Sequence, residues 1–497
     1  MARRRIAVAA LALLCALDCA AAPRWLKLNS ANFELLTTAD EQQGRAAILY
    51  FEEVRGCFLS SMQLTAASAL PVRIIAFSSP QEFALYRPNQ AAAAYAAGGR
   101  DRDYIVLQGS GPEYFPVAVH EYVHLLLRPS AEKLPVWLNE GLAELYSTLK
   151  PVGRKVRVGD IIPGHLRVLR DSAWLDLEPL TSVGRDSPHY NERNRATVFY
   201  AEAWALTHML LLSDKYRPKF PQFLAAAMKG DQNAAFEQIY GKKMPEVWTD
   251  LQSYLRKSGF KILLFNLQLE KAAEQPEMRE ATPLESGLAL AGLLGAIHKW
   301  DDARRAFEEL VRQNPASAEV EEAFGYVEWL AGGLDRASRH FARAAELGSR
   351  NPKLYFDYAA LLHQRGERAA ALIPLLSRAV ELDPGFMKAH FLLGIGMVEE
   401  KRYQEAIAHF AQVKRADREE AYPLFSAAAF AYYRLGKRKE ALEAAESARK
   451  YARGDLQVDA AEKMLDFLKE VWIPPAVEPA PQPAGQSNER HGVQVGP

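Results

Sequence analysis

The sequence predicts a mixed α+β domain followed by an all-α solenoid, and two observations lead to this fold class. In the first half of the chain, strand-like runs alternate with stretches of helical periodicity, a pattern typical of helices packed on a sheet. From about Leu284 onward, alanine-rich helical segments recur at a regular spacing. The length of 497 residues fits this division, because a domain commonly takes about 100–200 residues.

Three β-strands and one long helix are expected ahead of residue 110. Residues 33–38 and 72–77 have strand-like composition and flank a helix-period stretch over residues 41–62. Residues 104–107 form a third β run. This order predicts a small α+β lobe that packs on the helices following it.

The N-terminus has the composition of an export signal. Three arginines at residues 3–5 precede an apolar stretch over residues 6–17, and small residues follow at 20–22. We expect residues 1–21 to be a signal peptide, which predicts a periplasmic or secreted protein. The apolar stretch is too short to span a bilayer comfortably, so no transmembrane anchor is expected after cleavage.

The cysteines bear on the same segment. Lipidation of Cys15 or Cys19 is an alternative to cleavage, but Leu14 and Asp18 are poor residues to precede a lipidated cysteine. Removal of the signal would leave Cys57 alone. No intrachain disulfide is then possible, and stability must come from packing.

The net charge of the chain argues against two kinds of partner. The chain has 61 basic and 61 acidic residues. Without a basic excess, neither nucleic acid nor an anionic membrane surface is an expected partner.

One motif in the first domain has the spacing of a metal site. Residues 120–124 read His-Glu-Tyr-Val-His, and residues four apart lie on one face of a helix. His120 and His124 can therefore bind one Zn²⁺ while Glu121 lies beside the open coordination position. The flanking run over residues 117–127 is otherwise apolar, and buried imidazoles and carboxylates without partners are costly.

A second helical run supplies two further carboxylates. After the break at Arg128 and Pro129, an apolar stretch leads to Glu140 and, one turn later, Glu144. With the Asn139-Glu140-Gly141 sequence, this arrangement resembles the gluzincin metallopeptidases. The resemblance implies a zincin-like fold, with Glu140 as the third zinc ligand.

The same resemblance implies a role for Glu144. Thermolysin-like members place an acidic residue four positions after the ligand glutamate, where it accepts the other N–H of a ligating histidine. Glu144 occupies this position; a solvated helix carboxylate is the alternative. The chain departs from the best-known families because only fifteen residues separate His124 from Glu140. It is most similar to the peptidase-MA-like domains of exported bacterial proteins, which carry tetratricopeptide repeats.

Two further site features are implied by the resemblance. In gluzincins, the last strand before the metal helix lies at the cleft edge and pairs with extended substrate. The strand predicted at Tyr104, Ile105, Val106 and Leu107 is the candidate, and an ordinary inner strand is the alternative. Tyr200 lies where M1-like members keep a tyrosine that stabilises the oxyanion; the alternative is a core aromatic beside Trp204.

The second half of the chain is predicted to be a solenoid over residues 284–455. Alanines recur 34 or 35 residues apart, at Ala303, Ala337, Ala371, Ala406 and Ala441. Gly332, Gly366 and Gly436 precede three of them by five residues, where the turn between paired helices requires positive φ. This is the tetratricopeptide period. About five stacked repeats usually present a concave surface to a peptide or protein.

The function expected from these features is zinc-dependent hydrolysis of peptide bonds by an exported metallopeptidase. Its catalytic domain covers residues 22–275, the repeats recruit a protein or peptide partner, and the proline-rich residues 473–497 are disordered. Glu121 acts as general base towards a zinc-activated water. The alternative is a repeat scaffold whose zincin-like domain binds peptides without cleaving them. A site that only binds has no need of Glu121 beside an open position.

Overall fold

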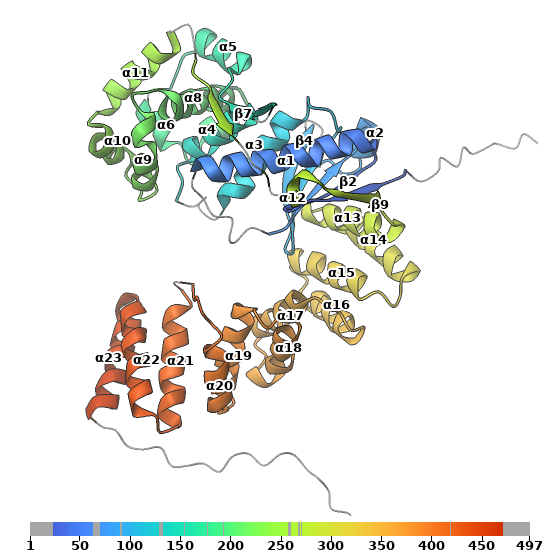
Figure 1. Ribbon diagram of the computed structural model, residues 1–497, viewed down its shortest axis with the longest axis vertical. Helices are drawn as coiled ribbons and strands as arrows, with labels where there is room; N and C mark the ends of the chain where they lie inside the picture. The colour runs from blue at the N-terminus through green and yellow to red at the C-terminus, as the bar shows by residue number, and fades with distance from the viewer. Residues whose placement is uncertain are drawn as a thin grey trace, which may run out of the picture. The chain divides into compact units, whose positions relative to one another are not determined.

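The computed structural model describes residues 23–470 except 63–69, 90–91, 129–132, 154, 176, 192, 257–259, 267–268, 270 and 418. The predicted signal peptide and the predicted disordered tail therefore lie outside the described residues. No helix in this described part of the chain is long and apolar enough to cross a membrane. Two compact units, Met1–Gly333 and Leu334–Pro497, make up the chain (Figure 1).

A mixed six-stranded sheet forms the centre of the first unit. Its strands lie in the order β4 (Ala94–Gly98), β5 (Asp103–Leu107), β3 (Val72–Ala76), β2 (Phe33–Thr37), β1 (Leu26–Asn29) and β9 (Glu277–Glu280). β3 pairs in parallel with both β2 and β5, whereas β4 pairs antiparallel with β5. The three predicted strands are therefore present as β2, β3 and β5.

The predicted substrate-binding edge at Tyr104 to Leu107 is wrong. β5 is hydrogen-bonded to β3 on one side and to β4 on the other, and all five of its residues are buried. The inner-strand alternative is therefore the one that holds. The two edge strands of the sheet are β4 and β9, and β4 packs against the metal-motif helix. Four of the five residues of β4 are alanine or glycine (Ala94, Ala96, Ala97 and Gly98), types depleted in strands.

One face of the sheet is covered by two long helices. α1 (Glu41–Met62) and α3 (Phe115–Leu127) pack on it (Figure 1). Alternation along the strands explains the two faces, because Ile74 and Ile105 point into this core while Ile75 and Val106 point to the other. α4 (Val136–Ser147) packs on α3.

The remaining elements before residue 275 surround α3 and α4. A small antiparallel sheet has the order β6 (Lys150–Val152), β7 (Lys155–Val158) and β8 (Leu263–Asn266). The other helices here are α2 (Pro80–Phe83), α5 (Pro163–Asp171), α6 (Leu177–Ser182), α7 (Pro188–Asn191), α8 (Arg193–Leu212), η2 (Arg217–Lys219), α9 (Phe220–Ala227), α10 (Gln232–Tyr240), α11 (Met244–Arg256) and α12 (Lys271–Glu274).

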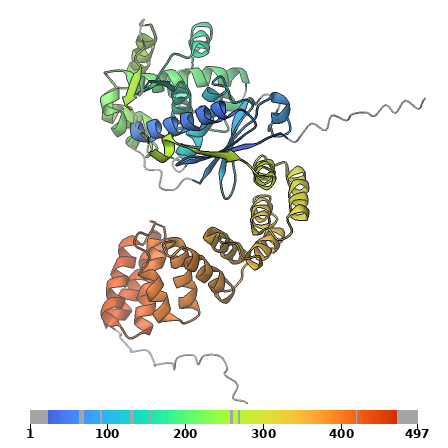
Figure 2. The same ribbon diagram turned by 45° about the vertical axis from the view of Figure 1, so that its right-hand side comes forward.

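The opposite face of the sheet is covered by the first helix of the repeat region. α13 (Pro283–Ala296) buries Ala289 and Leu293 against Ile75 and Val106 (Figure 2). At its start, Glu285 completes a capping box with Thr282 and also lies 3.0 Å from Nζ of Lys27. The sequence predicts a border between the two domains at residues 275–284. In the structure this segment contains β9 and the start of α13, and both belong to the first unit. The compact unit continues through α14 (Trp300–Gln313) and α15 (Ala318–Leu330).

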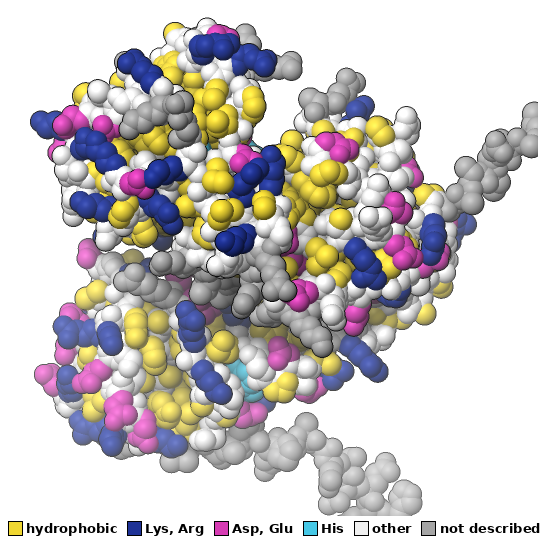
Figure 3. All heavy atoms as spheres, turned by 45° about the horizontal axis from the view of Figure 1, so that its top comes forward, with side chains coloured by type: hydrophobic (Ala, Val, Ile, Leu, Met, Phe, Trp, Pro, Cys, Tyr) yellow, Lys and Arg dark blue, Asp and Glu magenta, His cyan; other side chains and the backbone are white. Residues whose placement is uncertain are grey.

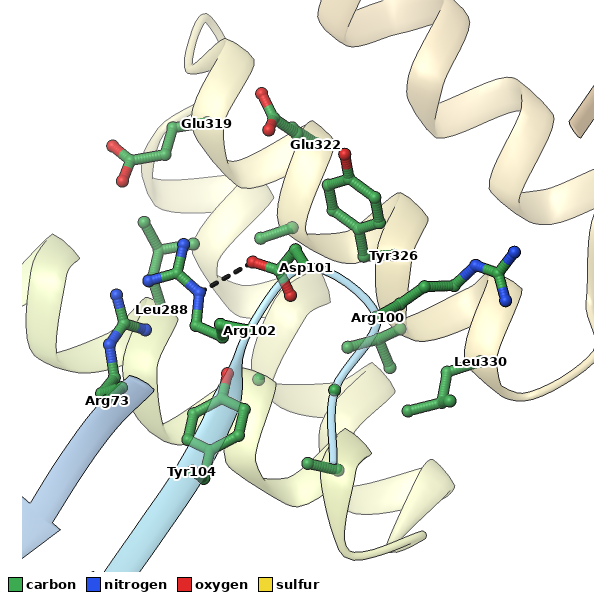
Figure 4. Close-up of a pocket in the computed structure, with 15 residues that line it drawn as sticks. Arg73, Arg100, Asp101, Arg102, Tyr104, Leu288, Glu319, Glu322, Tyr326 and Leu330 are labelled. Atoms are coloured by element: carbon green, nitrogen blue, oxygen red, sulfur yellow. Dashed lines mark hydrogen bonds and ion pairs between the residues drawn. The ribbon is translucent and has the colours of Figure 1, made fainter. Parts of the chain in front are cut away.

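The loop between β4 and β5 reaches these helices. Figure 4 shows it beside α13 and α15, around a small cavity of about 70 Å³. The Arg100 guanidinium carbon lies 3.4 Å from the centre of the Trp329 ring, and Arg102 Nε lies 2.7 Å from Asp101. A Cβ at Gly292 would lie 2.5 Å from the Tyr104 hydroxyl. Glycine therefore allows α13 to approach β5 closely.

The second unit consists of helices joined by short turns. They are α16 (Leu334–Glu346), α17 (Pro352–Gln364), α18 (Ala369–Leu382), α19 (Met387–Glu399), α20 (Tyr403–Phe410), α21 (Ala421–Arg434), α22 (Arg438–Tyr451) and α23 (Gly454–Glu470). Figure 3 shows acidic and basic side chains interspersed on both units, as the balanced composition predicts.

The predicted all-α repeats are confirmed, with one correction. Gly332, Gly366 and Gly436 have positive φ as expected, and the matching turn before α20 places Lys401 in the same region, at φ 61°. Ala371 is exposed rather than buried. One more residue separates Gly366 from the start of α18 than in the other repeats, so Leu372 occupies the position predicted for this alanine.

Candidate metal centre

Helices α3 and α4 bring three potential ligand atoms together. His120 and His124 lie one turn apart on α3, and their Nε2 atoms are 3.1 Å apart. Oε2 of Glu140, on α4, lies 3.4 Å from Nε2 of His120 and 3.3 Å from Nε2 of His124. Among the described residues, these three side chains form a cluster that could hold a metal ion, with their ligand atoms within 4.8 Å of one another. The structure thus places the three predicted ligands at one point.

An oxygen atom lies near the Nδ1 atom of each imidazole, on the ring edge that faces away from the other two ligand atoms. Nδ1 of His124 lies 2.8 Å from Oδ1 of Asn139, and Nδ1 of His120 lies 3.5 Å from Oε1 of Glu144. An acceptor at Nδ1 favours the tautomer whose Nε2 lone pair points to the centre. Glu144 therefore lies where its predicted role requires. The contact of Asn139 with His124 was not predicted from the sequence. The position of Asn139 directly before the predicted ligand Glu140 is the feature that could have indicated it.

The Glu140 carboxylate is buried, with 4% of its surface exposed. Oε1 accepts a hydrogen bond from the Tyr190 hydroxyl at 2.9 Å, while Oε2 has no hydrogen-bond partner among the described residues. Burial acts to raise the pKa of Glu140, but the two histidines outweigh it and hold the pKa at about 2. A charged, buried oxygen without a partner is costly.

These atoms fit a divalent cation. Zn–N bonds of about 2.0–2.1 Å in a tetrahedral site place two nitrogens only slightly further apart than the two Nε2 atoms lie here. Two neutral imidazoles and one carboxylate leave a fourth position free, the donor set of catalytic zinc sites. A cation at this point would also satisfy Oε2 of Glu140.

A glycine explains how α4 is held in place. A Cβ on Gly141 would lie 2.1 Å from Oγ1 of Thr207 and 2.4 Å from the carbonyl oxygen of Ala203. Both residues are on α8, so α4 and α8 pack almost backbone to backbone at this turn. Glycine after Glu140 thus fixes the depth at which the carboxylate is presented.

A cavity of about 500 Å³ opens beside the three ligand atoms. Glu121 and Tyr200 line it together with His120. Part of its wall is apolar, and Val117 and Ile161 remain 45% and 42% exposed there. The predicted base and the predicted oxyanion donor therefore face the same space.

Tyr200 belongs to this site and is only partly buried. Its ring centre lies 6.3 Å from that of His120, whereas Trp204, one turn later on α8, is fully buried. Burial, followed by the nearby Glu140 charge, raises the pKa of Tyr200 well above its usual range. The phenol is therefore a hydrogen-bond donor at neutral pH.

A second cavity of about 290 Å³ is lined by the other two predicted ligands, His124 and Glu140. Its lining also includes Tyr190, Arg128 and Arg185. Each predicted ligand thus borders one of two cavities.

His208 is a core residue. It is fully buried, and its Nε2 and Nδ1 atoms lie 3.0 Å from the Gly159 carbonyl oxygen and 2.8 Å from the Tyr254 hydroxyl. Both ring nitrogens are satisfied, so His208 is not available as a ligand.

Comparison with known proteins finds partial matches. No family model matches the chain. It is 32% identical over 120 residues to the cytochrome c-type biogenesis protein CycH of Pseudomonas aeruginosa, a match that covers 24% of this chain and 30% of that protein.

Two of the matching solved structures are YrrB and MamA. YrrB, a TPR protein with an unusual peptide-binding site, is 23% identical with a TM-score of 0.32, and the match covers 36% of this chain and 90% of YrrB. MamA is 20% identical with a TM-score of 0.26, and the match covers 31% of this chain and 88% of MamA.

Proposed function

We propose that this protein is an exported zinc-dependent peptidase whose repeats recruit a protein or peptide partner. The observation that supports it most is the convergence of His120, His124 and Glu140, with an unpartnered Glu140 oxygen facing both imidazoles. Glu121 lies next to this group and faces an open cavity. A site built only for structure would have closed coordination and no such base.

In the proposed reaction, His120, His124 and Glu140 hold the zinc ion. Zinc, when bound, supplies a Lewis acid and a water of lowered pKa. Glu121 takes the proton from the attacking water and returns it to the leaving amine. Tyr200 donates a hydrogen bond to the carbonyl oxygen as negative charge develops on it, an interaction worth a few kcal/mol in a water-poor site.

The proposed substrate is an extended polypeptide segment, cleaved within the chain. The two cavities that border the ligand residues would give room for substrate residues before and after the scissile bond. The free edge of β4 lies beside α3 and can add the substrate as a further strand.

A peptide-binding scaffold is the second candidate, and the comparisons favour it. The matches are a cytochrome c-type biogenesis protein and a TPR protein with a peptide-binding site, and repeats of the kind found in this chain commonly bind proteins or peptides. In this alternative, the first unit holds a peptide at the β4 edge without hydrolysing it.

Exchanging Glu121 for glutamine tests the enzyme against the scaffold. Glu121→Gln should keep stoichiometric zinc and lower turnover of an unfolded protein substrate by a factor of about 10² or more. Glu113→Gln, at an exposed position just before α3, is the matched control and should be fully active. A zinc-loaded, folded wild type that cleaves no internal peptide bond, yet retains a peptide, would support the scaffold.

A further inference from the structure

We propose that His165 is a positioning residue of the metal centre that acts through Glu144; the inference rests on the proposed zinc site. Nε2 of His165, in the first turn of α5, lies 3.0 Å from Oε2 of Glu144. The other oxygen of the same carboxylate lies 3.5 Å from Nδ1 of His120. One carboxylate therefore stands between a potential ligand and a second imidazole.

The contact is shielded from solvent. The His165 and Glu144 side chains are 14% and 18% exposed, so water competes little for a contact between them. The His165 ring also packs near Trp204, with ring centres 5.7 Å apart. Because Trp204 is fully buried, it limits the positions that His165 can adopt.

His165 has a specific effect on the carboxylate. Nε2 of His165 is buried without a hydrogen-bond partner among the described residues, and Oε2 of Glu144 lies within its reach at 3.0 Å. In the proposed role, Nε2 donates to Oε2 and so directs Oε1 towards His120, whose Nδ1 proton Oε1 would accept. His120 then presents the Nε2 lone pair to the metal, in a fixed ring orientation. Without the contact, the carboxylate can rotate within its pocket and the imidazole loses its acceptor.

The same turn of α5 also borders the large cavity. Ile161, Ile162 and Pro163, just before His165, line it together with Glu121. The segment that shapes the substrate side of the site therefore also orients a metal ligand. Sequence reasoning missed His165 because it lies twenty-one residues after Glu144 in an irregular region.

Two substitutions of similar size separate positioning from packing. His165→Leu removes the donor and keeps the bulk, whereas His165→Gln keeps an N–H donor. We expect His165→Leu to raise the zinc dissociation constant about 10 to 100-fold, the scale for lost partners of a ligand. His165→Gln should restore most of the affinity, and Arg167→Ala, exposed on the same helix, should leave it unchanged. Chelator competition on the full chain measures all four proteins.

The outcomes divide clearly. Equal affinity of His165→Leu and wild type, or equal loss in the leucine and glutamine variants, overturns the positioning role. Absence of zinc binding by wild type refutes the proposed function itself. Turnover of the zinc-saturated proteins adds a second readout: His165→Leu should lower kcat with KM little changed, since His165 does not line the cavity.

Discussion

The hydroxyl of Tyr190 donates a hydrogen bond to Oε1 of Glu140 at 2.9 Å, leaving Oε2 to face the two histidines. Tyr190 lies on α7, outside the two motif helices. Burial, followed by the Glu140 charge, raises its pKa to about 12. The phenol therefore stays protonated and orients the carboxylate at all physiological pH values.

Replacing Tyr190 or Tyr200 by phenylalanine should produce two different defects. Tyr190→Phe removes a charge-assisted hydrogen bond from a ligand and should weaken zinc binding about 10 to 100-fold. Tyr200→Phe should leave zinc affinity unchanged and lower turnover about 10²-fold, because Tyr200 lines the cavity and is the proposed oxyanion donor. Zinc titration combined with steady-state kinetics distinguishes them. The same defect in both variants would contradict the separate roles.

Truncating the two carboxylates of α4 tests the ligand set. Glu140→Ala should abolish stoichiometric zinc, because it removes one of three converging atoms. Glu144→Ala should retain zinc with about 10 to 100-fold lower affinity. Metal analysis after dialysis, followed by chelator competition, gives the order. The reverse order would shift the ligand by one helical turn.

The site was predictable where its residues lie close in sequence. His120, Glu121 and His124 share a helical face by spacing alone, and Glu140 follows on the next helix. Tyr190 and His165 reach the site through tertiary folding of α5 and α7, and no local periodicity marks them. Their detection required coordinates rather than a pattern.

Buried His208 should make stability depend on pH. Burial lowers the pKa of its imidazole from 6.5 to about 4. Between these values the unfolded chain binds a proton that the folded chain does not, so the free energy of unfolding falls as pH decreases. The contribution is fully present above about pH 6.5 and amounts to on the order of 3 kcal/mol across the interval.

Urea unfolding of the zinc-free protein at pH 7.5 and pH 5.0 measures this effect. His208→Gln removes the titrating group, so the variant should lose less stability than wild type on acidification. Identical pH dependence in both proteins would show that other groups cause it. The zinc-free form is used because zinc affinity itself depends on pH, and bound zinc would add its own pH-dependent contribution to the free energy of unfolding.

Truncation should reveal that α13 completes the first unit. A fragment of residues 22–275 lacks β9 and α13, which exposes the sheet face formed by Ile75 and Val106. We expect it to aggregate, whereas residues 22–333 should be monodisperse and unfold cooperatively. Size-exclusion chromatography and thermal unfolding compare the two. Cooperative unfolding of the shorter fragment would contradict the shared core.

The fold was predictable where the composition of a segment matches its structure. The helix at residues 41–62 and the strands β2, β3 and β5 have the expected periodicity. β4 was not predicted because alanine and glycine make up most of it. Its strand conformation comes from pairing with β5. α13 was assigned to the repeats because its sequence is that of a repeat helix; only its contacts show that it also covers the sheet.

Closure of the sheet by β9 and α13 has a consequence for the order of folding. Lys27 and Glu285 are ion-paired although 258 residues separate them in the chain. During synthesis, β1 leaves the ribosome early but gains its second neighbour only after nearly the whole first unit has been made. Non-local pairing of this kind slows folding. Completion of the central sheet is therefore a late step, and until then its outer face is open to chaperones and to aggregation.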